Sequence, residues 1–193
     1  ASPASAASIV GSYIQHNGGA ARMSGGGSGG TVGGGAGRGV AQRIGGFISA
    51  VGEVGLAEAL RREGLAELVD RPVQEILAAL LNRLGGPAST IDDVDARAAL
   101  ARLQEELLRD AQTPEDVEQV LRAQAVSIDV LLRDYFGLYL FEQFCRVFFE
   151  RLVHRRGESK ALGFLDDIKE FIKATRVNRV GRRAISKISW AGQ

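Results

Sequence analysis

The sequence contains few of the residues on which nucleophilic and metal sites depend. It has one cysteine, Cys145, and two histidines, His16 and His154, and no lysine precedes Lys160. A single cysteine excludes an internal disulfide and is typical of a reducing compartment, so we expect a cytoplasmic protein. The lack of an early lysine excludes a Walker A phosphate-binding loop from the glycine-rich first third.

Long apolar runs are also missing. The most apolar stretch, residues 135–149, is interrupted by Glu142, Gln143 and Arg146. It is shorter than the roughly 20 residues that a membrane-spanning helix needs. The N-terminal region lacks the continuous apolar core of a signal peptide. We therefore predict a buried helix over residues 135–149 and no contact with a membrane.

Acidic side chains are absent from the start of the chain, because none precedes Glu53. Residues 1–52 carry three arginines, residues 53–150 carry 10 basic and 19 acidic side chains, and residues 151–193 carry 11 basic and 4 acidic side chains. The three parts have net charges of +3, −9 and +7, although the whole chain has a net charge of only +1. An acidic middle and a basic end indicate opposed binding faces or self-complementary packing.

Glycine is concentrated near the start, where 17 of the 25 glycines lie between Gly11 and Gly55. Glycine, serine and alanine give residues 1–35 little surface to bury, and glycine loses much backbone entropy when it is ordered. We predict a flexible leader over residues 1–35. A single all-α domain over residues 36–185 and a C-terminal tail over residues 186–193 complete the expected organisation.

Within the leader, the spacing Gly25-x-Gly27-x-x-Gly30 matches the glycine pattern of a dinucleotide-binding loop. That loop needs a strand before it and a helix that opens on it, but glycine and serine flank the match on both sides. A chance match is expected in so glycine-rich a stretch. We therefore interpret these residues as a linker and expect no cofactor.

Apolar residues after the leader recur at helical spacing, and no segment shows the alternation of a strand. We predict an all-α fold, a helical bundle of about six helices. Thr90 and Thr113 precede acidic residues and are the predicted N-caps of two of these helices. The expected helices cover approximately residues 40–52, 56–64, 72–85, 90–111, 114–156 and 158–180.

Three glycines and an aromatic face within these helices lead to further predictions. Gly45 and Gly46 weaken the first helix, so we expect them to pack tightly against a neighbour. Gly137 is a candidate kink in the longest helix. We expect a buried position, in the core or in an obligate interface, for three aromatic residues at helical spacing, Phe141, Phe144 and Phe148.

No set of residues forms a convincing catalytic or metal site. His154 lies one helical turn after Glu150, but a metal would need more ligands, and the other histidine is in the leader. Cys145 has no base near it in the sequence, so we interpret it as a core residue. Three acidic residues at a helix start are interpreted as capping residues, namely Asp92, Asp93 and Asp95. We expect no enzymatic activity and no bound metal.

The basic end is the strongest chemical signal in the sequence. Beyond residue 168 only Glu170 opposes its basic side chains, several of which fall on one helical face. Such a face suits the phosphates of a nucleic acid, or an acidic surface on this or another protein, and a solvated basic terminus is the simpler alternative. The candidate contact residues are Lys169, Lys173, Arg176, Arg179, Arg182 and Arg183.

Three stretches resemble the QatB family of the bacterial Qat anti-phage defence system. Residues 36–68 read AGRGVAQRIGGFISAVGEVGLAEALRREGLAEL, a glycine- and alanine-rich start of a helix. Residues 71–107 read RPVQEILAALLNRLGGPASTIDDVDARAALARLQEEL, and residues 158–174 read ESKALGFLDDIKEFIKA. Together they span most of the helical part of the chain.

The resemblance implies a protein without a catalytic motif that acts together with a QueC-like (QatC-like) enzyme, an ATPase and a TatD-like nuclease. It implies that the QueC-like partner binds proteins of this family and modifies their extreme N-terminus; our own hypothesis is that the helical body forms the binding surface. We therefore expect a non-enzymatic adaptor or protein substrate in anti-phage defence. The alternative is a basic all-α protein that binds nucleic acid through its C-terminal helix.

The first residues depart from the family pattern. QatB-like proteins begin with a Gly-Thr-Ser type motif followed by a proline-rich stretch, whereas this chain begins ASPASAAS. Either that segment was removed or the sequence diverges there. No modification site is therefore assigned to a residue of this chain.

Overall fold

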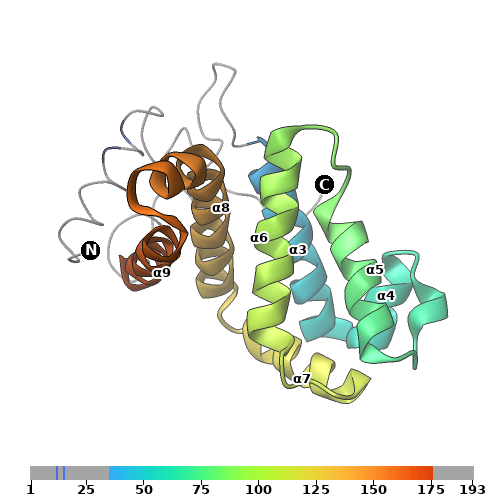
Figure 1. Ribbon diagram of the computed structural model, residues 1–193. Coiled ribbons are helices and arrows are strands. Elements are labelled where there is room, and N and C mark those ends of the chain that lie inside the picture. The colour runs from blue at the N-terminus through green and yellow to red at the C-terminus, as the bar shows by residue number, and fades with distance from the viewer. Residues whose placement is uncertain (1–11, 13–14, 16–34, 176–193) are drawn as a thin grey trace.

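The fold is all-α, as the apolar spacing predicts (Figure 1). The computed structural model describes residues 12, 15 and 35–175, without the side chains of residues 150–152, 155, 156 and 171–175. No strand occurs among these residues. None of their helices is long and apolar enough to cross a membrane. The predicted leader, apart from residues 12, 15 and 35, and the predicted tail lie outside the described residues.

Seven α-helices and one short 3-10 helix make up the described part of the chain. Two central helices, α3 and α6, lie side by side, with α4 and α5 on one flank, α8 and α9 on the other, and α7 across one end (Figure 1). The elements are α3 (Gly35–Val54), α4 (Leu56–Arg62), η1 (Ala66–Leu68), α5 (Val73–Gly85), α6 (Ile91–Leu108), α7 (Pro114–Ala125), α8 (Ile128–Arg156) and α9 (Glu158–Thr175).

The single helix predicted over residues 114–156 is divided in two. Val126 ends α7 and Ser127 precedes α8, where the Ser127 carbonyl oxygen accepts hydrogen bonds from the amides of Val130 and Leu131. Valine and serine both have low propensity for the interior of a helix, and serine favours helix starts. Beyond this break α8 continues through Gly137, the predicted kink, without interruption.

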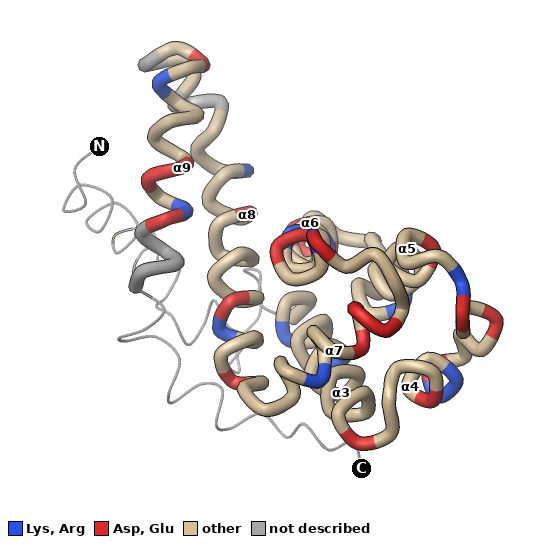
Figure 2. Tube along the Cα trace, turned by 90° about the horizontal axis from the view of Figure 1, so that it is seen from below, with Lys and Arg blue, Asp and Glu red and all other residues tan. Residues whose placement is uncertain are grey.

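The buried side chains form two apolar clusters rather than one core. The larger cluster joins α3 to α7 with the first part of α8, and its last buried member is Tyr139. The smaller one joins the second part of α8 to α9. We call residues 35–139 the body and residues 140–175 the arm; Figure 2 shows that α8 and α9 extend away from the other helices.

The three aromatic residues predicted to be buried belong to the arm. Phe141 is 6% exposed and Phe144 is 1% exposed, which confirms the prediction for both. Phe148 is half-buried, and its ring stacks on that of Phe144 at a centroid distance of 4.6 Å. Residues of α9 cover this face, chiefly Phe164, Leu165 and Ile168.

At the start of two helices, a backbone amide donates a hydrogen bond to a carboxylate from a distant part of the sequence. The amide of Ala36, in the first turn of α3, donates to Asp92 Oδ2 at 3.2 Å. The amide of Leu56, the first residue of α4, donates to Glu118 Oε2 at 2.9 Å, and this bond lowers the pKa of Glu118. Both carboxylates accept hydrogen bonds from amides that have no carbonyl partner within the helix, and both lie at the positive end of a helix dipole.

Close packing in α3 is observed at two glycines that the sequence analysis did not single out. A Cβ atom on Gly37 would lie 2.5 Å from the Tyr139 ring, and one on Gly52 would lie 2.8 Å from the Cβ of Ala125. Gly46 is exposed and has no neighbour within 4 Å of such an atom, so close packing is not its role. Gly45 is buried, but the periodicity of α3 alone did not identify Gly37 or Gly52.

Alanine at two glycines of α3 should have opposite effects on stability. Gly46→Ala should raise the free energy of unfolding by about 0.5–1 kcal/mol, because it removes backbone freedom without a clash. Gly37→Ala should lower it by about 1–3 kcal/mol, because the Tyr139 ring is fully buried and has no room to move. Urea denaturation of both variants measures the difference, and equal effects would contradict the close contact at Gly37.

Candidate functional site

The structure describes the side chain of one of the six basic residues that the sequence singled out. Lys169 lies on α9, and its Nζ atom is 3.4 Å from Glu106 Oε1 on α6. Lys173 also lies on α9, but its side chain is not described. The four arginines from Arg176 to Arg183 lie outside the described residues. The structure therefore places Lys169 against the acidic middle of its own chain and leaves the other five candidates as predictions.

The acidic residues at the start of α6 divide into one cap and two tertiary contacts. Thr90 and Asp93 form a reciprocal capping box, in which the Asp93 amide donates to Thr90 Oγ1 and Asp93 Oδ2 accepts from the Thr90 amide. The hydrogen bonds from Thr90 hold the pKa of Asp93 below its usual value. Capping is confirmed for Asp93, and Asp92 also lies in the first turn of α6, where its charge suits the helix dipole. Capping was the wrong interpretation for Asp95, which lies beyond the first turn and makes a tertiary contact.

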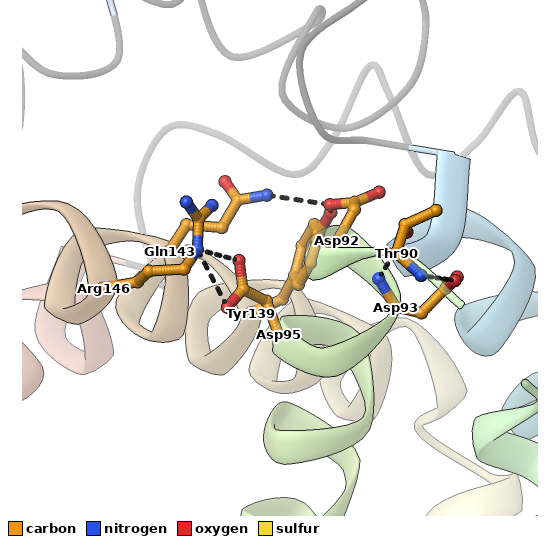
Figure 3. A network of polar contacts seen from close by, with 7 residues as sticks. All are labelled: Thr90, Asp92, Asp93, Asp95, Tyr139, Gln143 and Arg146. Carbon is orange, nitrogen blue, oxygen red and sulfur yellow. Dashed lines mark hydrogen bonds and ion pairs between the residues drawn. The ribbon is translucent and has the colours of Figure 1, made fainter. Parts of the chain in front are cut away.

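Asp92 joins three helices. Its Oδ1 atom accepts hydrogen bonds from the Tyr139 hydroxyl and, at 3.3 Å, from Gln143 Nε2, both on α8 (Figure 3). Its Oδ2 atom accepts from the amide of Ala36 on α3. Burial and the bond to Asp92 both raise the pKa of Tyr139, so the phenol remains a donor. Asp92 therefore ties the first turn of α3 to α6 and α8.

One turn further along α6, Asp95 pairs with Arg146 of α8. The Arg146 Nε atom donates to both carboxylate oxygens, at 3.2 and 2.9 Å (Figure 3). The Asp95 side chain is 6% exposed, whereas that of Arg146 is 45% exposed. Burial raises the pKa of Asp95, and the hydrogen bond and positive charge of Arg146 oppose that rise. The pair ties α6 to the arm.

Further along the same face, Arg102 of α6 bonds to Glu142 of α8, and its guanidinium lies 5.7 Å from the centre of the Phe141 ring. Asp92 and Asp95 of α6 thus accept from neighbouring helices, while Asp93 caps its own helix. Such an arrangement positions helices. It leaves no carboxylate among Asp92, Asp93 and Asp95 poised as a base beside a nucleophile.

The other reactive side chains are poorly suited to chemistry. Burial raises the pKa of the Cys145 thiol to about 12, so the thiolate is scarce at neutral pH. His154 is exposed near the far end of α8. Within the described part of the chain, no group of three or more His, Cys, Asp or Glu side chains could hold a metal ion.

The polar contacts between α6 and α8 were missed at the sequence level, although a signal for them was present. Asp92 and Asp95 are three residues apart, and Tyr139, Gln143 and Arg146 follow at helical spacing on α8. Each set marks one polar face of a helix. Two such faces with complementary groups indicate a helix pair, but spacing alone does not say which helices meet.

A family model described as the Qat anti-phage system associated protein QatB matches residues 25–193. The match covers every helix from α3 to α9 and the basic end. Searches of curated proteins and of solved structures found no match.

Proposed function

Since this chain belongs to the QatB family of the Qat anti-phage system, we propose that it acts there as a non-enzymatic adaptor or protein substrate. The match over residues 25–193 carries the conclusion and establishes a role in anti-phage defence. The proposed partner is the QueC-like enzyme of the system, and the ATPase and the TatD-like nuclease are further candidates. The proposed location is the cytoplasm.

In this proposal the helical part of the chain, body and arm together, binds the QueC-like enzyme, and the N-terminal segment is presented for modification. The position of Asp92 supports this division, because it fixes the start of α3 directly after the glycine-rich residues. The chemistry of the described side chains supports a passive role, since the carboxylates at the start of α6 are occupied and the Cys145 thiol is protonated.

The contact between Lys169 and Glu106 favours the adaptor over the nucleic-acid-binding alternative. A basic residue that is paired within its own chain must lose that partner before it meets a phosphate. Residues 53–150, with their net charge of −9, would also repel a duplex that lies across the body.

The chain should co-purify with the QueC-like enzyme when both are expressed together, and should show no turnover alone. Intact-mass spectrometry of the co-expressed chain should reveal an added group that fragmentation places in the N-terminal segment. The same chain expressed without the enzyme is the control. The proposal is contradicted if the co-expressed chain neither associates with the enzyme nor gains mass.

Charge reversal at the basic end separates the two functions. We expect the unmodified chain to bind duplex DNA or RNA weakly at physiological salt, and glutamate at Arg176, Arg179, Arg182 and Arg183 to change little. A matched control reverses the charge of four exposed arginines that lie in α4, in α5 or between these helices. They are Arg61, Arg62, Arg71 and Arg83. The nucleic-acid alternative would be favoured if the unmodified chain binds tightly and the salt dependence of binding becomes flatter in the variant with reversed C-terminal arginines but not in the control.

A further inference from the structure

Polar contacts join the arm to α6, whereas apolar side chains hold each of the two parts together. The body cluster ends at Tyr139, and the buried arm cluster starts at Phe141. Residues 92, 95, 102 and 106 of α6 follow one stripe at helical spacing. We call this stripe and its partners the α6 seam: Asp92 with Gln143, Asp95 with Arg146, Arg102 with Glu142, and Glu106 with Lys169.

The seam is weaker than the clusters on either side of it. Two of its cations are well exposed, since the side chains of Arg102 and Arg146 are 43% and 45% exposed. Ion pairs of this kind contribute little net free energy and are screened by salt. Burial of apolar side chains such as Phe144 and Ile168 contributes far more. The arm should therefore separate from α6 at a lower free energy than global unfolding requires.

Asp92 links this seam to the beginning of α3. Its carboxylate accepts from Gln143 of the arm on one oxygen and from the Ala36 amide on the other. A second contact also links α8 to the first turn of α3, because Gly37 packs directly against the ring of Tyr139, one residue before the arm begins. A displacement of α8 at residues 139–143 therefore disturbs both supports of the first turn of α3.

We propose that the arm is a displaceable element and that Asp92 is the positioning residue that transmits its displacement to the start of α3. The coupling belongs to the isolated chain. Its consequence rests on the proposed function: a partner seated on the arm would alter how residues 1–34 leave the body. Asp92 thus connects a docking event to the presentation of the N-terminal segment.

Hydrogen exchange of the full chain, followed by mass spectrometry without any partner, tests the coupling. Arg102→Glu places a second carboxylate against Glu142 and should release the arm. We expect exchange in α9 and in residues 36–43 to become about tenfold faster, while α5 is unchanged. Glu142→Arg in the same chain should restore the slow rates. Lys160→Glu, the same charge change at an exposed position of α9, is the control.

Asp92→Ala should uncouple the two sites. In that background residues 36–43 exchange fast from the outset, and adding Arg102→Glu should accelerate α9 alone. If Arg102→Glu does not fold, added salt replaces it and should accelerate α9 and residues 36–43 of the unmodified chain in parallel. An α9 that responds while residues 36–43 do not, or a uniform change that includes α5, would overturn the proposal. Neither result bears on binding of the QueC-like enzyme.

Discussion

Phe144→Ala should destabilise the arm by about 3–5 kcal/mol, the usual cost of removing a fully buried aromatic ring. Phe144 is 1% exposed, stacks on Phe148, and shares a cluster with Phe164 and Ile168 of α9. Among the described residues, α8 and α9 supply this cluster, so loss of the ring weakens the packing between these two helices. We expect α9 to unfold locally while the body keeps its structure.

Circular dichroism and hydrogen exchange together measure this effect. The variant should lose helical signal equivalent to the 18 residues of α9, and fast exchange should be confined to the arm. Val147→Ala, three residues further along α8 at a position that is 37% exposed, should leave both measurements nearly unchanged. Unaltered melting and unaltered exchange in Phe144→Ala would show that this face has been misassigned.

Arg146→Met should lower the free energy of unfolding by about 2–3 kcal/mol at pH 7. Methionine replaces the aliphatic part of the arginine side chain but removes both hydrogen bonds to Asp95. The carboxylate, which is 6% exposed, is then left buried without a partner. Arg133→Met, on the same helix, removes only a bond to the Asp129 carbonyl oxygen and should have a small effect.

The cost of Arg146→Met should shrink as the pH falls. Burial already raises the folded-state pKa of Asp95, and loss of Arg146 removes the two effects that oppose this rise. The folded variant therefore binds a proton at a higher pH than the unfolded chain, whose aspartates titrate near pH ~3.9. Stability relative to the unmodified protein should recover as the pH drops through the folded-state pKa.

Denaturation of both proteins between neutral pH and pH 4 gives the comparison. The difference between them matters, because carboxylates with lowered pKa values, such as Asp93 and Asp116, weaken both proteins alike as they become protonated. A second variant, Asp95→Asn with Arg146→Met, should show no such recovery. A pH-independent cost of Arg146→Met would mean that Asp95 finds another donor.

Features set within one helix were predictable from the sequence. Thr90 and Thr113 cap their helices through the Asp three residues later, as the local pattern indicates. Burial of Phe141 and Phe144 follows from their spacing on one face. In each case the interacting groups are a few residues apart, so helical geometry alone brings them together.

Features that depend on which helices meet were not predictable. Asp95 lies two residues after the capping residue Asp93, and local spacing did not reveal that it pairs with Arg146 of α8. Gly46 and Gly37 belong to the same helix, but only Gly37 faces a ring. The break at Val126 and Ser127 arises where the chain turns from α7 into α8, which a continuous apolar stripe conceals.

The distant carboxylates that cap α3 and α4 determine when the starts of these helices can form during synthesis. Asp92 follows Ala36 by 56 residues in the sequence, and Glu118 follows Leu56 by 62 residues. At about 5–20 residues per second, each helix start lacks its acceptor for roughly 3–12 s after it leaves the ribosome. During that interval α4 and α5 can already pack against α3, but the side of α3 that later contacts α6, α7 and α8 is uncovered. The first helices of the body are therefore completed by later parts of the chain. A chain that stops before α7 supplies Asp92 for α3 but lacks Glu118, so the start of α4 stays without its acceptor.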